Sequence, residues 1–265
     1  HRMSFKHIVS RDNPVFKQLK RLADNARERR SEGLTLLDGV HLIEDYLAVF
    51  GEPELVIIPE GQSSVEANGL MQSLEHLDTI MLPTLMFAEL SPVVSSTGIL
   101  AMVRIQQLAL ADQPNFVLML EDIQDPGNLG SMLRTAAAAG VEAVYLSSSC
   151  TDPWSPKALR GGQGAQFVLA MQTRADIVAE LERFNGDSYA TAMNGESLYS
   201  QELRGACAFV FGNEGAGLRK DTMAAASKRV TIPMAQGQIG RIESLNAAAA
   251  AAVCLFERRR QQLSG

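Results

Sequence analysis

The sequence predicts an α/β protein made of two domains. Short apolar runs alternate along the chain with segments whose apolar residues recur at helical spacing. The chain has 265 residues, 46% of them hydrophobic, which suffices for one large domain or two ordinary ones. A polar stretch at 111–115 interrupts the alternation. We therefore expect an N-terminal domain at 1–107, a linker at 108–115 and a C-terminal domain at 116–265.

The N-terminal domain is predicted to be a small α/β unit. After the Asn13-Pro14 turn, apolar residues at helical spacing predict a helix over 15–22. Residues 34–50 follow the pattern of a strand, a turn at Gly39 and a helix. The segment 54–61 predicts a short buried strand, and 79–106 predicts a strand, a helix and another strand.

The C-terminal domain has a more regular alternation of strands and helices. The strand candidates are Phe116–Leu120, Ala143–Leu146, Gln166–Met171, Ser188–Met193, Ala208–Phe211 and Val230–Ile232. Helical stretches lie between most of them. This order predicts a mostly parallel sheet that is covered on both faces.

Composition argues against several classes of protein. No apolar run approaches the roughly 20 residues of a membrane span, so we expect a soluble, cytoplasmic protein without membrane contact. The cysteines are far apart and odd in number, which favours buried reduced thiols: Cys150, Cys207 and Cys254. All histidines lie in the first third of the chain: His1, His7, His41 and His76. The remainder therefore lacks the imidazole that a Ser-His-Asp hydrolase or a zinc enzyme needs.

Charge is unevenly distributed along the chain. The net charge of −6 by itself argues against a nucleic-acid partner. Residues 1–30, however, carry nine Lys or Arg against three acidic residues. A basic segment on an acidic protein is typical of nucleic-acid binding, although a solvated helix face explains the charges equally well.

Polar turns follow three of the predicted C-terminal strands, and ligands of parallel sheets bind at the carboxyl ends of strands. In the first turn, Gly127 permits unusual backbone conformations and Asn128 can cap the next helix. Arg134 follows six residues later, and its guanidinium suits phosphate. Asn128 as a simple cap and Arg134 as a surface cation are the alternatives.

The second turn, FVFGNEGAGLRK at 209–220, contains three glycines around Asn213-Glu214. It permits close approach of a ligand to the backbone, or else forms only a tight loop. The third turn follows Pro233, and the helix after it contains six successive alanines. Ser244 and Asn246 at the start of that helix have no packing reason to be polar.

These stretches resemble a known family. DPGNLGSMLRTAAAAG, FGNEGAGL and IPM…IESLN are similar, in order and separation, to the three motifs of the SpoU/TrmH family of SPOUT methyltransferases. The resemblance covers residues 116–260 and, more loosely, a substrate-binding domain before them. It implies methyl transfer from S-adenosyl-L-methionine to a ribose 2′-hydroxyl of RNA, with ribosomal RNA favoured over transfer RNA. It also implies a homodimer and a C-terminal parallel sheet with a deep trefoil knot.

The resemblance also implies which residues form the site. The catalytic candidates are Asn128, Arg134, Glu214, Ser244 and Asn246. The cofactor candidates are Met193, Asn194, Gly195, Phe211, Gly212, Asn213, Ile232, Met234, Leu245 and Asn246. The RNA-binding candidates are Lys17, Lys20, Arg21, Lys157 and Arg160, and no metal is expected. We expect Arg134 to orient the ribose or its phosphate, because a guanidinium hardly deprotonates and is a poor base.

Two other functions compete with this interpretation. The loop between Met234 and Glu243 is longer than in many relatives, which leaves open a non-catalytic RNA-binding paralogue that keeps the knot. A nucleotide-dependent oxidoreductase would fit the alternating α/β order. The absence of a G-x-G-x-x-G fingerprint argues against it.

Overall fold

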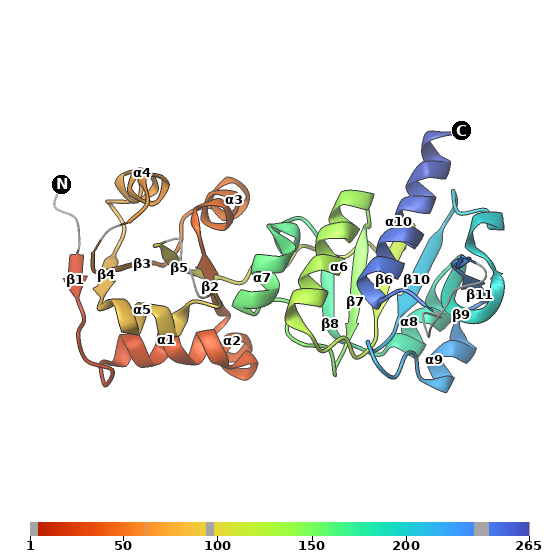
Figure 1. Cartoon of the computed structure of the whole chain (residues 1–265), viewed down its shortest axis with the longest axis horizontal. Coiled ribbons are helices and arrows are strands. Elements are labelled where there is room, and N and C mark those ends of the chain that lie inside the picture. The colour runs from red at the N-terminus through yellow and green to blue at the C-terminus, as the bar shows by residue number, and fades with distance from the viewer. Residues whose placement is uncertain (1–4, 62, 94–97, 236–243, 265) are drawn as a thin grey trace. The chain divides into compact units, whose positions relative to one another are not determined.

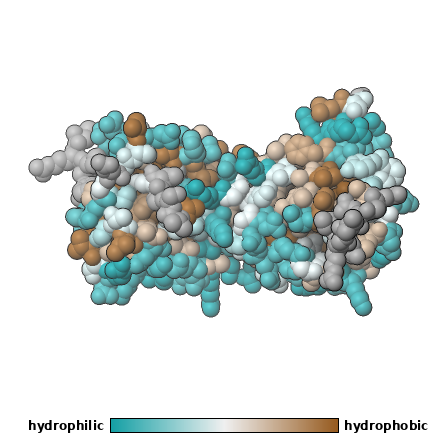
Figure 2. All heavy atoms as spheres, in the orientation of Figure 1, coloured by the Kyte–Doolittle hydropathy of each residue, from teal (hydrophilic) through white to brown (hydrophobic). Residues whose placement is uncertain are grey.

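The computed structural model of the chain contains two compact units (Figure 1). It describes residues 5–61, 63–93, 98–235 and 244–264. The first unit comprises His1–Gln106 and Asp152–Phe167, and the second comprises Gln107–Thr151 and Val168–Gly265. The backbone therefore passes between the units at three points. Figure 2 shows a mainly hydrophilic surface on the visible face of each unit.

The first unit contains a five-stranded mixed sheet in the order β1-β4-β3-β5-β2. Its strands are β1 (Phe5–His7), β2 (Leu34–Asp38), β3 (Leu55–Pro59), β4 (Thr79–Leu82) and β5 (Leu100–Arg104). Strands β1, β3 and β4 are parallel, whereas β5 is antiparallel to β3 and β2. Its helices are α1 (Pro14–Asp24), α2 (Ala26–Glu32), α3 (Val40–Phe50), α4 (Val65–Ser73), α5 (Thr84–Leu90), α7 (Pro156–Gly162) and the 3-10 turn η1 (Ala165–Phe167).

Helix α1 shows how the sequence determines this unit. Asn13 caps the helix, because its Oδ1 accepts a hydrogen bond from the backbone N–H of Val15 at 2.8 Å. Phe16, Leu19 and Leu22 recur at helical spacing and are buried in the core. The helix predicted from these apolar positions is confirmed.

The segment at 152–167 is joined to the rest of the first unit by buried polar contacts. Arg29 Nε donates to Asp152 Oδ2 at 2.7 Å, and both side chains are at least nine-tenths buried. The Thr35 hydroxyl donates to the backbone carbonyl of Trp154 at 2.6 Å. The ring of Phe167 packs edge-on against Tyr46. Residues more than 100 positions apart thus share one core.

We expect Arg29→Ala to destabilise the protein by about 3–5 kcal/mol, because it leaves the buried Asp152 carboxylate without its cation. Denaturant unfolding of the intact chain measures the change. Arg30→Ala is the matched control, since Arg30 is exposed and adjacent. Equal stability of the two variants would contradict a structural role for the Arg29–Asp152 pair.

The second unit contains a six-stranded sheet in the order β11-β9-β10-β6-β7-β8, and every pairing is parallel. Its strands are β6 (Phe116–Leu120), β7 (Ala143–Ser147), β8 (Met171–Ala175), β9 (Asp187–Ser197), β10 (Cys207–Phe211) and β11 (Lys228–Thr231). Its helices are α6 (Pro126–Ala139), α8 (Ile177–Arg183), the 3-10 turn η2 (Leu198–Ser200), α9 (Lys220–Ala225) and α10 (Ala247–Leu263).

Helices cover both faces of this sheet, as predicted. Helices α6 and α10 pack side by side (Figure 1). On the opposite face, α8 and α9 cover a core that includes Val117, Met119 and Tyr145. Alternate residues of β6 serve the two faces, which explains why all five of its residues are apolar and buried.

One predicted strand is wrong. Residues Ala165–Phe167 form the turn η1, and β8 begins only at Met171. The backbone at Gln163 and Gly164 has positive φ, which breaks an extended chain just before this point. Gln166 is buried, and its Nε2 donates to the carbonyls of Pro153 and Ala158 at 3.0 Å each. Tertiary hydrogen bonds thus hold this segment in a turn.

The cysteines have the environments expected of structural thiols. Cys207 and Cys254 are fully buried, and burial raises the pKa of Cys207 to about 12. Burial also raises the pKa of Cys150, which is partly exposed. In the part of the chain that the structure describes, no helix is both long and apolar enough to span a membrane.

Candidate functional site

A buried carboxylate connects the first two motif loops at the carboxyl edge of the six-stranded sheet. Glu121 follows β6 directly and is only 2% exposed. Its carboxylate accepts hydrogen bonds from the backbone N–H of Arg219, at 2.9 Å, and from the Thr222 hydroxyl. The neighbouring Asp122 pairs with the Arg219 guanidinium at 2.8 Å. The loop after β6 and the loop after β10 are therefore held together.

Asn213 and Glu214 strengthen this junction. Asn213 Nδ2 donates to the carbonyl of Asp122 at 2.8 Å, and its Oδ1 accepts from the N–H groups of Gly215 and Ala216. Glu214 Oε1 accepts from the backbone N–H of Gln124 at 2.9 Å. Both side chains thus shape the loops from which a site could be built.

The capping role predicted for Asn128 is wrong. Asp125 is the N-cap of α6, and its Oδ1 accepts a hydrogen bond from the N–H of Asn128 at 2.8 Å. Pro126 occupies the first helical position, where a missing N–H costs nothing, so the helix begins before Asn128. Asn128 lies half-buried in the first turn, and its side chain is not needed to start the helix.

Arg134 lies further along α6 and is exposed. Its guanidinium has no hydrogen-bond or ion-pair partner among the residues that the structure describes. Its neighbours Leu133 and Ala136 are fully buried. A rigid helix thus holds a free cation whose donors can meet a phosphate or hydroxyl.

A cavity of about 170 Å³ lies between the carboxyl ends of β9 and β11 and the start of α10. It is lined by Thr191, Ala192, Met193, Thr231, Ile232, Met234, Ser244, Leu245 and Ala250. Apolar walls with a few hydroxyl groups are typical of a site for a small organic ligand. They suit a nucleoside, whose base has apolar faces and whose edges and ribose form hydrogen bonds.

The cavity brings together only part of the predicted site. Met193, Ile232, Met234, Leu245 and the catalytic candidate Ser244 line it. Of the other candidates, Asn194, Gly195, Phe211, Gly212, Asn213 and Asn246 do not line it. Sequence reasoning missed four lining residues: Thr191, Ala192, Thr231 and Ala250. Their positions in the sequence could have identified them, since each lies within four residues of a predicted site residue.

Two predicted glycines serve contacts within the chain. A Cβ atom on Gly195 would lie 2.7 Å from backbone atoms of Val230, and one on Gly212 would lie 2.4 Å from the carbonyl carbon of Gly217. Asn246 caps α10 through a 2.8 Å hydrogen bond from the N–H of Ala249. The longer third-motif loop and Glu243 lie outside the described residues.

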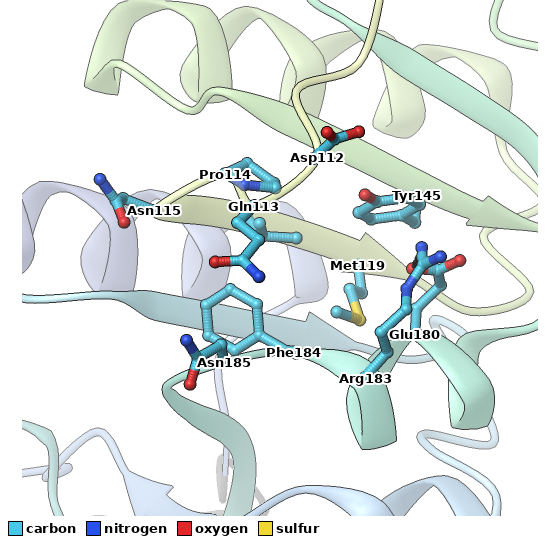
Figure 3. Close-up of a pocket in the computed structure, with 11 residues that line it drawn as sticks. Asp112, Gln113, Pro114, Asn115, Met119, Tyr145, Glu180, Arg183, Phe184 and Asn185 are labelled. Carbon is cyan, nitrogen blue, oxygen red and sulfur yellow. Dashed lines mark hydrogen bonds and ion pairs between the residues drawn. The ribbon is translucent and has the colours of Figure 1, made fainter.

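The second unit has another cavity, of about 190 Å³, near the amino ends of its strands. Figure 3 shows Met119 and Tyr145 of the sheet, Glu180 and Arg183 of α8, and the chain at Phe184 around it. None of the predicted site residues lines it. Its position at the amino edge argues against a role in the reaction, because ligands of parallel sheets bind at the carboxyl edge.

The predicted RNA-binding residues all belong to the first unit. Lys17 and Arg21 are exposed on α1, whereas Lys20 contacts Asp24 at 3.0 Å and the Glu89 carbonyl at 3.2 Å. Lys157 and Arg160 are exposed on α7. Within the described ranges, no cluster of three or more His, Cys, Asp or Glu side chains could hold a metal ion.

Comparison with known proteins identifies similar chains. Residues 115–256 match the SpoU rRNA Methylase family. An uncharacterized tRNA/rRNA methyltransferase of Synechocystis is 34% identical over 96% of this chain and 94% of its own length. The 23S rRNA (guanosine(2553)-2′-O)-methyltransferase RlmP of Bacillus subtilis is 30% identical over 96% of this chain and 99% of its own.

Solved structures share the fold of the whole chain. A crystal structure of an RNA 2′-O ribose methyltransferase matches with a TM-score of 0.81 and 31% sequence identity. The match covers 97% of this chain and 99% of the other. The likeness therefore includes both compact units.

Proposed function

Since this chain belongs to the SpoU rRNA methylase family, we propose that it transfers a methyl group from S-adenosyl-L-methionine to a ribose 2′-hydroxyl of ribosomal RNA. The family has the knotted SPOUT fold, and the second unit has the all-parallel sheet of that fold. The observation that supports the proposal most directly is the cavity formed by β9, β11 and the start of α10. Four of the predicted cofactor residues, Met193, Ile232, Met234 and Leu245, line it, which supports the proposal.

The residues of the cavity fit the cofactor. Met193, Ile232, Met234 and Leu245 offer apolar surface to an adenine ring, and Thr191, Thr231 and Ser244 offer hydroxyl groups to its polar edges. When bound, the cofactor supplies a sulfonium methyl that is already activated for transfer. The protein mainly needs to hold the acceptor ribose in line with it.

Arg134 is the residue that we assign to the acceptor. Its free guanidinium, held on the rigid helix α6, donates to the ribose hydroxyl or to the adjacent phosphate. It orients these groups and stabilises negative charge that develops on the hydroxyl oxygen. It does not accept the proton, because a guanidinium stays protonated at neutral pH. The hydroxyl proton passes instead to solvent water, to which Arg134 is exposed. Glu214 and Asn246 support a loop and a helix start near the site through their side chains, whereas Asn128 contributes only its backbone N–H to the start of α6.

We also propose that the enzyme is a homodimer that acts in the cytoplasm. Arg134 and Met193 are both exposed in the single chain, and a second copy would cover such side chains. The buried free thiols of Cys207 and Cys254 fit a reducing compartment. Light scattering of the purified chain determines the oligomeric state.

The reaction is tested by incubating labelled S-adenosyl-L-methionine with total RNA from a strain that lacks the protein. We expect label in a 2′-O-methylated nucleoside of ribosomal RNA. Label on a base would overturn the ribose assignment. Calorimetric binding of the cofactor without transfer to any RNA would identify the non-catalytic paralogue.

The basic face of α1 is proposed to contact RNA phosphates. We expect replacement of Lys17, Lys20 and Arg21 by glutamine to weaken RNA binding and to make its salt dependence shallower, by about 0.7 to 0.9 in slope per lost phosphate contact. Fluorescence anisotropy at several salt concentrations measures both quantities. The charge-preserving triple variant, Lys17→Arg, Lys20→Arg and Arg21→Lys, is the control. An unchanged slope in the glutamine variant would make these residues a solvated helix face.

A further inference from the structure

The second unit has a third cavity whose chemistry the proposed reaction does not use. It has a volume of about 490 Å³ and lies at the amino edge of the six-stranded sheet. Its walls include Asn115 before β6, Glu142 before β7 and Gly205 before β10. The candidate reaction site lies at the opposite, carboxyl edge of the same sheet. The two cavities are therefore separate sites.

Three arginines and one acid line this cavity: Arg204, Arg258, Arg259 and Glu142. The acid is already engaged, because Glu142 Oε2 accepts a hydrogen bond from the backbone N–H of Asn115 at 2.6 Å. The cavity therefore has an excess of positive charge, although the chain as a whole is acidic. We call these three side chains the arginine pocket.

Arg258 is a buried cation that forms no direct ion pair among the described residues; the acid whose charge acts on it within the cavity is Glu142. Arg258 is 6% exposed, and its guanidinium lies 4.2 Å from the centre of the Phe116 ring. Its Nε has no hydrogen-bond partner, and its Nη2 makes only long contacts, of 3.3 and 3.5 Å, to the carbonyls of Gly205 and Arg204. Burial lowers the pKa of Arg258 below its ordinary value. A buried charge of this kind is costly unless it is paired, so the pocket favours an anion.

The other two arginines lie at the opening of the pocket. Arg259 is exposed, and no residue in the described part of the chain pairs with it. Arg204 is also exposed and is fixed by a 2.9 Å ion pair with Glu202 and a 3.1 Å hydrogen bond to the Gln261 carbonyl. A buried guanidinium on an aromatic platform and two exposed ones thus converge on one space.

We propose that the arginine pocket binds a phosphate group, and that this group belongs to the backbone of the RNA substrate. Guanidinium donors match phosphate oxygens in geometry and charge. A contact at the amino edge would bind the RNA at a point distant from the reacting nucleotide. Backbone contacts of this kind position RNA without reading its sequence. The assignment of this phosphate to RNA rests on the proposed function. Phosphate binding itself does not require methyl transfer.

The double variant Arg204→Gln, Arg259→Gln tests the proposal, because both side chains are exposed and the buried Arg258 stays in place. We expect it to bind ribosomal RNA fragments at least about fivefold more weakly in anisotropy measurements, with a salt slope reduced by about 1. Arg183→Gln is the control. Arg183 is an exposed arginine of the same unit on α8 and does not line the arginine pocket. It lines the other cavity, which Figure 3 shows.

A second measurement distinguishes the source of the phosphate. Inorganic phosphate is titrated calorimetrically into the wild type and the double variant. If phosphate binds only to the wild type, and the double variant keeps the RNA affinity of the wild type, the pocket is a site for a free phosphate compound. Unchanged RNA affinity and no phosphate binding would overturn the proposal. Failure of the proposed reaction would appear separately, as an absence of methyl transfer by the wild type. Cofactor binding, measured on the same samples, distinguishes that failure from a defect in phosphate or RNA binding.

Discussion

The Arg134→Ala variant is expected to lose methyl transfer by at least about 100-fold while still binding S-adenosyl-L-methionine. Arg134 is exposed and without a partner in the described structure, so its side chain contributes little to stability. The cavity assigned to the cofactor is lined by other residues. The loss should therefore fall on orientation of the acceptor ribose. Methyl transfer under saturating cofactor, calorimetric cofactor affinity and the melting temperature measure the three effects separately.

Arg134→Lys shows which property of the side chain matters. Lysine keeps the charge but lacks the planar fork of donors. We expect it to recover only a small part of the activity if the fork positions phosphate and hydroxyl together. Full activity in the alanine variant would remove Arg134 from the site. Full activity in the lysine variant would reduce its role to charge alone.

Gly195→Ala is expected to have the largest effect on the fold. The new Cβ would lie 2.7 Å from the backbone nitrogen and carbonyl carbon of Val230, and neither atom can move unless β9 and β11 separate. We expect a loss of about 3 kcal/mol or more in the free energy of unfolding. Cofactor affinity should fall as well, because the cavity lies between the ends of these two strands. Denaturant unfolding and calorimetry measure the two losses.

Gly215→Ala is the matched stability control for this change. Gly215 lies in the same unit, and its new Cβ would be 3.6 Å from Asn213 Oδ1, which is an ordinary contact. We expect a stability within about 1 kcal/mol of the wild type. If both alanine variants were equally stable, close approach of β9 and β11 at Gly195 would not be what requires glycine there.

The sheet of the second unit could be predicted because its strands are locally encoded. Phe116–Leu120 is a continuous apolar run, and the strand β6 has the same bounds. The prediction failed at Gln166, where the local apolar pattern competes with buried hydrogen bonds to Pro153 and Ala158. Association of 152–167 with the first unit depends on Arg29 and Asp152, which are far apart in sequence. No periodicity reveals such a pair.

The sequence predicted at which edge of the sheet the candidate site lies, but not which residues line it. The three polar turns predicted a site at the carboxyl edge of the sheet, and the candidate cavity lies at that edge. A glycine that admits a ligand and a glycine that admits another strand look identical in sequence, and Gly195 is of the second kind. Asp125 and Asn128 are both good N-caps. Only the preference of Pro126 for the first helical turn distinguishes them, and this signal was present in the sequence.

The three passages of the backbone between the compact units constrain how this protein could have evolved. Recombination at the linker could replace the N-terminal part of the chain. The new part would lack Arg29 and Thr35, which now form hydrogen bonds with Asp152 and with the carbonyl of Trp154. The inherited segment at 152–167 would then lose its buried polar partners. A successful exchange therefore requires matching changes in the new N-terminal unit and in the segment 152–167. We expect the two units to diverge together along a lineage. The two units are thus inherited as a single piece.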